Sequence, residues 1–309
     1  MNLLSDSHGG TDLVARKLLE KLGSRVFDGI NLIVSSAHES WIKPHQVNVL
    51  WNHHNVDQPA IRNLSNSDYL KKIDCFIYVS HWQYEKYRYK FHIPEHKSVV
   101  IRNAVDELFP KEKPKKLKLI YTSTPWRGLD ILLDCFEALD RNDIELEIFS
   151  STKIYGKEFD RENADKYSDL FARAASMRNV NYRGFASNQQ VREALLSAHI
   201  FAFPSTFEET SCLAVIEAGM AGLSIVTTNL GALFETCGAW ARYVGYDSNR
   251  TYLTRKFTFA LERAINEFWN PENQRNLKEQ SNYFNRFYGW NTRRIEWENL
   301  LSQLKKLGR

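Results

Sequence analysis

The chain has 309 residues, of which 43% are hydrophobic and 25% charged, with a formal net charge of +4. This composition excludes a disordered chain, and the length suffices for two domains of ordinary size. No apolar run reaches the length of a membrane span, residues 1–6 do not form a signal peptide, and the four cysteines lack metal-binding spacing. The positive charge is spread out and no nucleic-acid motif occurs. We therefore expect a cytoplasmic protein that does not bind nucleic acid.

Apolar runs typical of buried strands alternate with helical patterns along most of the chain. One helix is predicted where Leu129, Leu132, Leu133, Phe136 and Leu139 recur at helical spacing. After about residue 250 the strands end, and helical runs close the chain, the last carrying Trp290 and Trp297 as packing anchors. Alternation of this kind predicts parallel, doubly wound α/β sheets. The expected strands are residues 30–35, 47–51, 75–79, 98–101, 117–122, 144–149, 180–183, 200–203 and 224–227.

A boundary between domains is expected near residues 106–116, where a turn is followed by a Pro- and Lys-rich stretch. We predict a short N-terminal domain over residues 1–107, a second domain over residues 108–286, and a C-terminal helix within residues 287–309. The lysine-rich run at residues 111–118 is interpreted as a solvated linker. Alternatively, it contacts an acidic membrane surface or an anionic acceptor.

The most informative segment is residues 204–222, where Glu209 and Glu217 stand eight positions apart. An apolar strand pattern precedes this segment and another follows it, so the whole forms a βαβ unit. Ligands of open α/β sheets sit at the carboxyl ends of the strands, where this turn must lie. The amides that open the helix attract phosphate, and Glu217 could accept hydrogen bonds from a ribose. This pattern indicates a nucleotide-sugar site; the amides belong to Thr210, Ser211, Cys212 and Leu213.

Several further motifs occur in a set order along the chain. They are Gly9-Gly10-Thr11-Asp12 before a helix, Trp51-Asn52-His53-His54 at a strand end, Trp126-Arg127-Gly128 at a helix start, residues 100–106, and Tyr288-Gly289-Trp290. Together with the Glu209–Glu217 pair they resemble the retaining GT-B glycosyltransferases of family four, the glycosyl transferases group 1. The resemblance extends from about Gly9 to Trp297.

This resemblance implies two Rossmann-like domains facing each other across a cleft, with the C-terminal helix crossing back to the first domain. It also implies retaining, metal-independent transfer of a sugar from a nucleotide-diphosphate sugar, without another cofactor. The acceptor would be a glycan, a lipid-linked molecule or a small molecule bound by the N-terminal domain, and a peripheral contact with the inner face of a membrane would suit a lipid-linked acceptor.

Individual roles also follow from the resemblance. Glu209 would contact the donor sugar near its anomeric carbon, Glu217 the ribose hydroxyls, and Arg127 the pyrophosphate. His53, with His54 as the alternative, would face the reacting sugar. The amides of Gly9 and Gly10 would contact the diphosphate, and Phe185 would lie at the base or, alternatively, in the core.

The sequence departs from the family pattern at three points. Thr122 stands where many members carry an Arg, and Asp12 stands where Glu is usual. The N-terminal half is short, so either its first strand is reduced to residues 1–5 or the chain start is truncated. The alternatives to a transferase are a catalytically degenerate nucleotide-sugar-binding or scaffold protein, a sugar-nucleotide epimerase, and a phosphorylase. A phosphorylase would need a lysine for pyridoxal phosphate, and no lysine lies in a suitable sequence.

Overall fold

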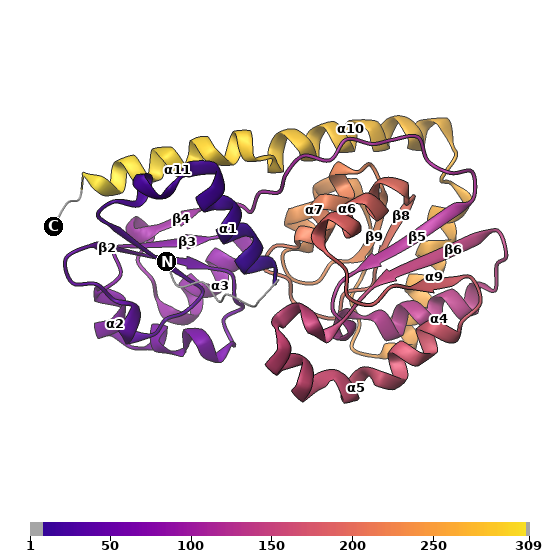
Figure 1. The fold of residues 1–309 in the computed structure, drawn as a ribbon, viewed down its shortest axis with the longest axis horizontal. Coiled ribbons are helices and arrows are strands. Elements are labelled where there is room, and N and C mark those ends of the chain that lie inside the picture. The colour runs from indigo at the N-terminus through magenta and orange to yellow at the C-terminus, as the bar shows by residue number, and fades with distance from the viewer. Residues whose placement is uncertain (1–8, 307–309) are drawn as a thin grey trace. The chain divides into compact units, whose positions relative to one another are not determined.

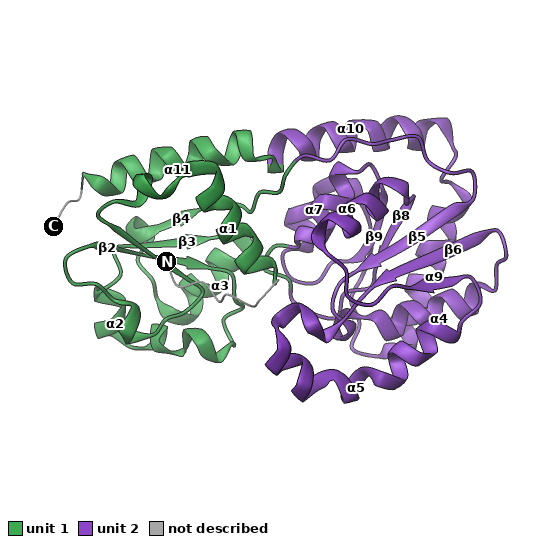
Figure 2. Ribbon diagram, in the orientation of Figure 1, with its two compact units in different colours: residues 1–106, 209–211, 288–309 green, residues 107–208, 212–287 purple. Residues whose placement is uncertain are grey.

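The computed structural model describes residues 9–306 and divides the chain into two compact units. Unit 1 comprises Met1–Asp106, Glu209–Ser211 and Tyr288–Arg309, and unit 2 comprises Glu107–Glu208 and Cys212–Phe287 (Figure 2). The first strand expected at residues 1–5 lies outside the described residues. Each unit contains its own parallel sheet flanked by helices, as the alternation of strand and helix patterns predicts.

Unit 1 is built on a four-stranded parallel sheet in the order β1-β2-β3-β4 (Figure 1). Its strands are β1 (Ile30–Val34), β2 (Val47–Asn52), β3 (Cys75–Tyr78) and β4 (Ser98–Val100). Its α-helices are α1 (Gly10–Leu22), α2 (Ser67–Lys71), α3 (His81–Phe91) and α11 (Trp290–Lys305). Four short 3₁₀ helices complete the described part of this unit: Ser24–Phe27, Glu39–Trp41, Pro59–Ser65 and Glu95–Lys97.

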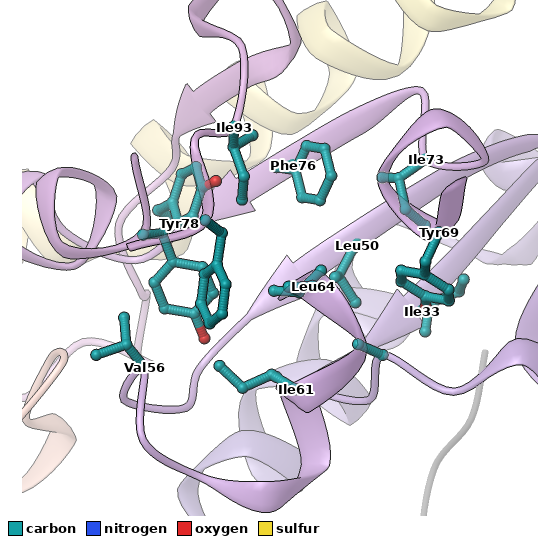
Figure 3. Packing of buried hydrophobic residues seen from close by; sticks show 13 residues of the cluster. Ile33, Leu50, Val56, Ile61, Leu64, Tyr69, Ile73, Phe76, Tyr78 and Ile93 are labelled. Atoms are coloured by element: carbon teal, nitrogen blue, oxygen red, sulfur yellow. The ribbon is translucent and has the colours of Figure 1, made fainter. Parts of the chain in front are cut away.

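The two faces of this sheet bury different partners. Ile33, Leu50 and Phe76 stand opposite one another on neighbouring strands and belong to one buried apolar cluster (Figure 3). Successive side chains of a strand point to opposite faces, so Trp51 points away from that cluster. Its ring lies 4.8 Å from the ring of Trp297, which is buried in α11. The C-terminal helix therefore packs on the sheet of unit 1, and the prediction of Trp297 as a packing anchor is confirmed.

Unit 2 contains a six-stranded parallel sheet in the order β10-β9-β8-β5-β6-β7. Its strands are β5 (Leu117–Thr122), β6 (Ile144–Phe149), β7 (Val180–Tyr182), β8 (Ile200–Phe203), β9 (Ser224–Thr228) and β10 (Ala241–Val244). Its α-helices are α4 (Leu129–Leu139), α5 (Lys157–Ser176), α6 (Asn188–Ser197), α7 (Leu213–Met220), α8 (Leu233–Cys237), α9 (Arg250–Asn266) and α10 (Pro271–Tyr288). Its 3₁₀ helices are Pro125–Arg127, Thr152–Tyr155 and Gly238–Trp240. The predicted doubly wound α/β class is confirmed, although β10 is a strand that the sequence pattern did not indicate.

The strand order of unit 2 reverses at β5. This strand pairs with β6 on one side and with β8 on the other. The strands β6 and β7 therefore extend the sheet on one side of β5, and β8, β9 and β10 extend it on the other. Ligands of open α/β sheets bind where the order reverses, outside the carboxyl ends of the strands. The turns that follow β5 and β8 are therefore the first place to look for a site.

Three further observations bear on the sequence predictions. All four cysteines are free and buried. Within residues 9–306 there is no helix with both the length and the apolar character that a membrane crossing requires. Most of the lysine-rich run is exposed, but Lys113 is half-buried and its Nζ donates to the carbonyl of Gly222 at 3.0 Å. Lys113 is therefore not part of a freely solvated linker.

Candidate functional site

The turn after β5 contains Trp126-Arg127-Gly128 and is fixed by local hydrogen bonds. The buried Tyr121 hydroxyl donates to the carbonyl of Thr124 at 2.7 Å, and the Nε of Arg127 donates to the hydroxyl of Thr124 at 3.1 Å. Gly128 has a φ of +93° and forms the N-cap of α4. A Cβ at this position would lie 2.0 Å from the carbonyl oxygen of Pro204. Only glycine therefore allows the turn after β5 to approach the turn after β8 this closely.

Side-chain contacts join the same two turns. The hydroxyl of Thr206 donates to the carbonyl of Trp126 at 3.2 Å. The guanidinium of Arg127 lies 4.4 Å from the ring centroid of Phe207, which is cation–π distance. Arg127 is thus held beside the start of the Glu209–Glu217 segment, at the point where the strand order reverses. Its charge is permanent and its planar fork suits phosphate oxygens.

The turn after β8 is rigid before it reaches Glu209. Ser205 donates its hydroxyl to the carbonyl of Phe207 at 3.1 Å, and its own carbonyl accepts from the hydroxyl of Thr228 on β9 at 2.8 Å. Glu209 is only 6% exposed and Thr210 8%. The carboxylate of Glu209 is therefore held in a largely buried position on a turn fixed by its neighbours.

Helix α7 presents its N-terminus directly after this turn. It begins at Leu213, and the N-cap Cys212 makes no side-chain capping bond. Burial raises the pKa of the Cys212 thiol to about 11, so this side chain is neutral at pH 7. The first amides of a helix have no partners within the helix and carry its positive dipole end. Cys212 is buried, whereas Ser211 and Leu213 are half-buried.

The opposite end of α7 is held by α10. The carbonyl of Met220 accepts from the hydroxyl of Ser281 at 2.6 Å, and Gln280 donates to the carbonyl of Leu223 at 2.8 Å. Gly219 allows the ring of Phe284 to pack against the helix, because a Cβ there would lie 2.5 Å from that ring. These contacts fix the axis of α7 and thereby the position from which Glu217 extends.

Glu217 has a partner that the sequence did not indicate. Its Oε1 accepts from the Nη1 of Arg192 on α6 at 2.9 Å, and Glu217 is 7% exposed. Arg192 lies 25 residues earlier in the chain, so no local spacing reveals this pair. Only the packing of α6 beside α7 brings the two side chains together.

Phe185 lies in the loop between β7 and α6. It follows Gly184, whose φ is +65°, and it is 45% exposed. The alternative that Phe185 is a core residue is therefore wrong, because core residues of this unit are buried. Helix α6 begins with a capping box in which its N-cap Ser187 and Gln190 bond each other's backbone, and the helix carries Arg192. The loop with Phe185 and the carboxylate of Glu217 thus both adjoin α6.

His53 follows β2 in unit 1. Its backbone amide donates to the hydroxyl of Ser35 at 3.0 Å, and its ring centroid lies 4.5 Å from that of Trp51. The Nε2 atom is buried and has no hydrogen-bond partner among the described residues. Burial, helped by the neighbouring His54, lowers the pKa of His53 to about 3. The ring is therefore neutral at pH 7.

The loop that carries both histidines is clamped in place. The carbonyl of His54 accepts from the Nε2 of Gln83 at 2.9 Å and from the hydroxyl of Tyr87 at 3.0 Å, both on α3. Burial also lowers the pKa of His54. Residues Glu209–Ser211 are part of unit 1, and within this unit the hydroxyl of Thr210 donates to the carbonyl of His53 at 2.8 Å. The structure thus brings the His53 backbone next to the residue that follows Glu209.

The Gly-Gly motif stands at the start of α1. Gly9 is buried and forms the N-cap with φ −61° and ψ 156°, and Gly10 is the exposed first residue of the helix. The φ and ψ angles of Gly9 are open to any residue, so its backbone conformation does not explain the glycine. Among residues 9–306, no group of three or more His, Cys, Asp or Glu side chains is arranged to hold a metal ion.

Two Rossmann-like units with parallel sheets define a GT-B glycosyltransferase fold. The second unit has a basic residue, the buried carboxylate of Glu217 and a helix N-terminus at its switch point. The family model for glycosyl transferases group 1 matches residues 100–282, and the chain belongs to this family. No curated protein sequence matches the chain.

Solved structures support the fold. A glycosyltransferase from Rickettsia africae superposes with a TM-score of 0.69 at 14% identity, over 99% of this chain and 84% of that one. A sucrose-phosphate synthase from Thermosynechococcus elongatus gives 0.68 at 15% identity, over 95% and 80%. The Anabaena protein HepE in complex with UDP-glucose gives 0.67 at 14% identity, over 94% and 82%.

Proposed function

We propose that the protein transfers a sugar from a nucleotide-diphosphate sugar to an acceptor hydroxyl, with retention of configuration and without a metal ion. The observation that carries the proposal is the arrangement at the switch point of unit 2. There Arg127 lies beside the turn that leads to the buried Glu209 and, after it, to the N-terminus of α7.

The charges of this arrangement suit the transition state of glycosyl transfer. Negative charge grows on the departing diphosphate, and preorganised positive groups stabilise it best. Arg127 and the first amides of α7 supply such groups in unit 2, and the amides of Gly9 and Gly10 would add to them. The carboxylate of Glu209 would orient the sugar and stabilise the positive charge that develops on its ring.

The pKa of His53 bears on how the acceptor loses its proton. A group with a pKa of about 3 is a poor general base at neutral pH, because the best base has a pKa near the working pH. We therefore assign the proton to an oxygen of the departing phosphate, which lies on the same face as the leaving bond. Attack from that face gives retention. Neutral His53 would form a hydrogen bond with the reacting sugar.

Donor and acceptor are assigned to different units. In unit 2, Glu217 would bind the ribose hydroxyls and Phe185 would lie against the base. Unit 1 would bind the acceptor: a glycan, a lipid-linked molecule or a small molecule. We also place the protein in the cytoplasm, where a lipid-linked acceptor would bring it to the inner face of a membrane.

The first experiment is a thermal-shift screen with UDP, GDP and ADP and their sugar conjugates. A donor that binds only the native state raises the melting temperature by mass action. UDP-glucose, the ligand of the HepE complex, is the natural starting compound. NMR of the product formed with an acceptor pool then reports the anomeric configuration, and activity in EDTA reports metal dependence. Inversion, or loss of activity in EDTA, contradicts the corresponding part of the proposal.

Single substitutions separate the two carboxylates. Glu217→Ala should weaken donor binding, whereas Glu209→Ala should largely preserve binding and lower turnover. Equal losses of affinity in both variants, with unchanged rates, would contradict these roles. His53→Ala should lower turnover in a folded protein; unchanged activity would transfer the role to His54 or remove it.

A degenerate nucleotide-sugar-binding protein is the second candidate. It is favoured by Thr122, which stands in place of a second basic residue. Binding of a donor without hydrolysis or transfer to any acceptor would identify this function. A sugar-nucleotide epimerase would instead yield an epimerised donor, which the same NMR spectra would show.

A further inference from the structure

Arg192 joins the side chain of Glu217 to the backbone of Glu107 within unit 2, and its own side chain is largely buried. Its Nη1 lies 2.9 Å from Oε1 of Glu217, and the two side chains are 17% and 9% exposed. Its Nη2 donates to the carbonyl of Glu107 at 3.0 Å. Both ends of one guanidinium are therefore engaged, by a side chain on α7 and by the backbone at the start of unit 2.

This geometry fixes the Glu217 side chain before any ligand arrives. A free Glu side chain populates many rotamers, and ordering it costs about 1.5–2 kcal/mol. The guanidinium is rigid and always charged, and its second bond to Glu107 fixes its own position. The conformational entropy of the Glu217 side chain is thus lost when the protein folds rather than when the ligand binds. An ionised carboxylate has about four acceptor sites. Glu217 can therefore accept from Arg192 and from a pair of ribose hydroxyls together.

We propose that Arg192 is a positioning residue that holds the carboxylate of Glu217 in the orientation that recognises a ribose diol, and so sets a preference for ribonucleotides over 2′-deoxyribonucleotides. This inference rests on the proposed function, in which Glu217 binds the ribose of the donor. Arg192 acts through Glu217 and is not itself assigned a contact with the substrate.

The test compares pairs of nucleotides rather than single affinities. Calorimetry gives the dissociation constants of UDP, GDP and ADP and of their 2′-deoxy counterparts for the wild type. For the nucleotide that binds most tightly, the dissociation constant of the 2′-deoxy form should be at least about tenfold higher, because this form loses a hydrogen bond to a charged group. Arg192→Met should bring this ratio close to one, with most of the change in the affinity for the ribonucleotide.

Two further variants keep the test sharp. Arg192→Lys keeps the positive charge but loses the two-pronged fork, so its ratio should lie between those of the wild type and Arg192→Met. The matched control is Arg173→Met, because Arg173 also joins two acceptors of unit 2, Asp134 and Glu137. Arg173→Met should retain the wild-type ratio. Thermal unfolding of each variant shows whether it is folded.

The outcomes separate this inference from the proposed function. If Arg192→Met and Arg192→Lys weaken ribo- and deoxyribonucleotides equally, Arg192 has only a structural role and the inference is wrong, even if Glu217→Gln removes the preference. If Glu217→Gln keeps the preference, the ribose assignment of Glu217 is wrong and the inference falls with it. If no nucleoside diphosphate binds the wild type, the proposed function itself is refuted.

Discussion

Gly128 offers the most direct test of how the two turns of the site are brought together. Its φ of +93° disfavours any L-residue, and a Cβ added there would lie 2.0 Å from the carbonyl oxygen of Pro204 and 2.9 Å from the carbonyl carbon. The two nearest atoms belong to the backbone of Pro204, so the clash cannot be relieved by rotation of a side chain. Gly128→Ala must therefore push the turn after β5 away from the turn after β8.

Two independent costs set the size of the effect. The positive φ costs a residue with a Cβ about 1–2 kcal/mol, and overpacking costs about 1–3 kcal/mol, together about 2–5 kcal/mol. For a domain of about 150–250 residues each kcal/mol shifts the melting temperature by about 2–4 °C. Gly128→Ala should therefore lower the melting temperature of unit 2 by about 4–20 °C.

The matched control is Gly184→Ala. Gly184 also has a positive φ, +65°, but a Cβ there meets only ordinary contacts, the nearest being the hydroxyl oxygen of Tyr182 at 3.7 Å. Only the conformational cost then remains, and the expected decrease is about 2–8 °C. Calorimetry or circular dichroism of both variants gives the comparison. If Gly128→Ala is no more destabilising than Gly184→Ala, the close approach of the two turns is refuted.

Two predictions concern buried ionisable groups and pH. The pKa of His53 is lowered to about 3, so below pH 6.5 the folded state binds fewer protons than the unfolded state. The free energy of unfolding therefore decreases as the pH is lowered. Between pH 7.5 and 5 the wild type should lose about 2 kcal/mol more stability than His53→Gln in urea unfolding; an equal loss in both proteins would show that His53 titrates normally. Burial lowers the pKa of Lys113 to about 7, so here the charged form is penalised and stability rises as pH increases from 7 toward 10.5. From pH 6 to 9 the wild type should gain about 2.7 kcal/mol relative to Lys113→Met, and a constant difference between the two proteins would contradict this.

Local patterns in the sequence were sufficient to predict most elements. The strands β1 to β9 and helix α4 were predicted from apolar runs and helical spacing, because burial of one face imposes a period that is visible within a few residues. Strand β10 was missed. It lies at the edge of its sheet, three of its four residues are half-buried, and its Arg242 and Tyr243 break the apolar pattern. Its hydrogen bonds to β9, rather than its own composition, make it a strand.

The candidate site was only partly predictable. The spacing of Glu209 and Glu217 and the motif Trp126-Arg127-Gly128 identified the two turns, since each motif is local. Their mutual approach was not predictable, because Gly128 and Pro204 are far apart in sequence and meet only through the pairing of β5 with β8.

The sequence by itself determined the α/β class, the family and the residue types available for chemistry, because these are encoded in local periodicity and short motifs. The tertiary structure decided which charges meet and which groups lose water. It pairs Arg192 with Glu217, and it buries the ring of His53, which lowers the pKa of this residue to about 3. Both outcomes depend on contacts between distant segments and on desolvation, and neither quantity is a property of a residue or of its neighbours in the chain.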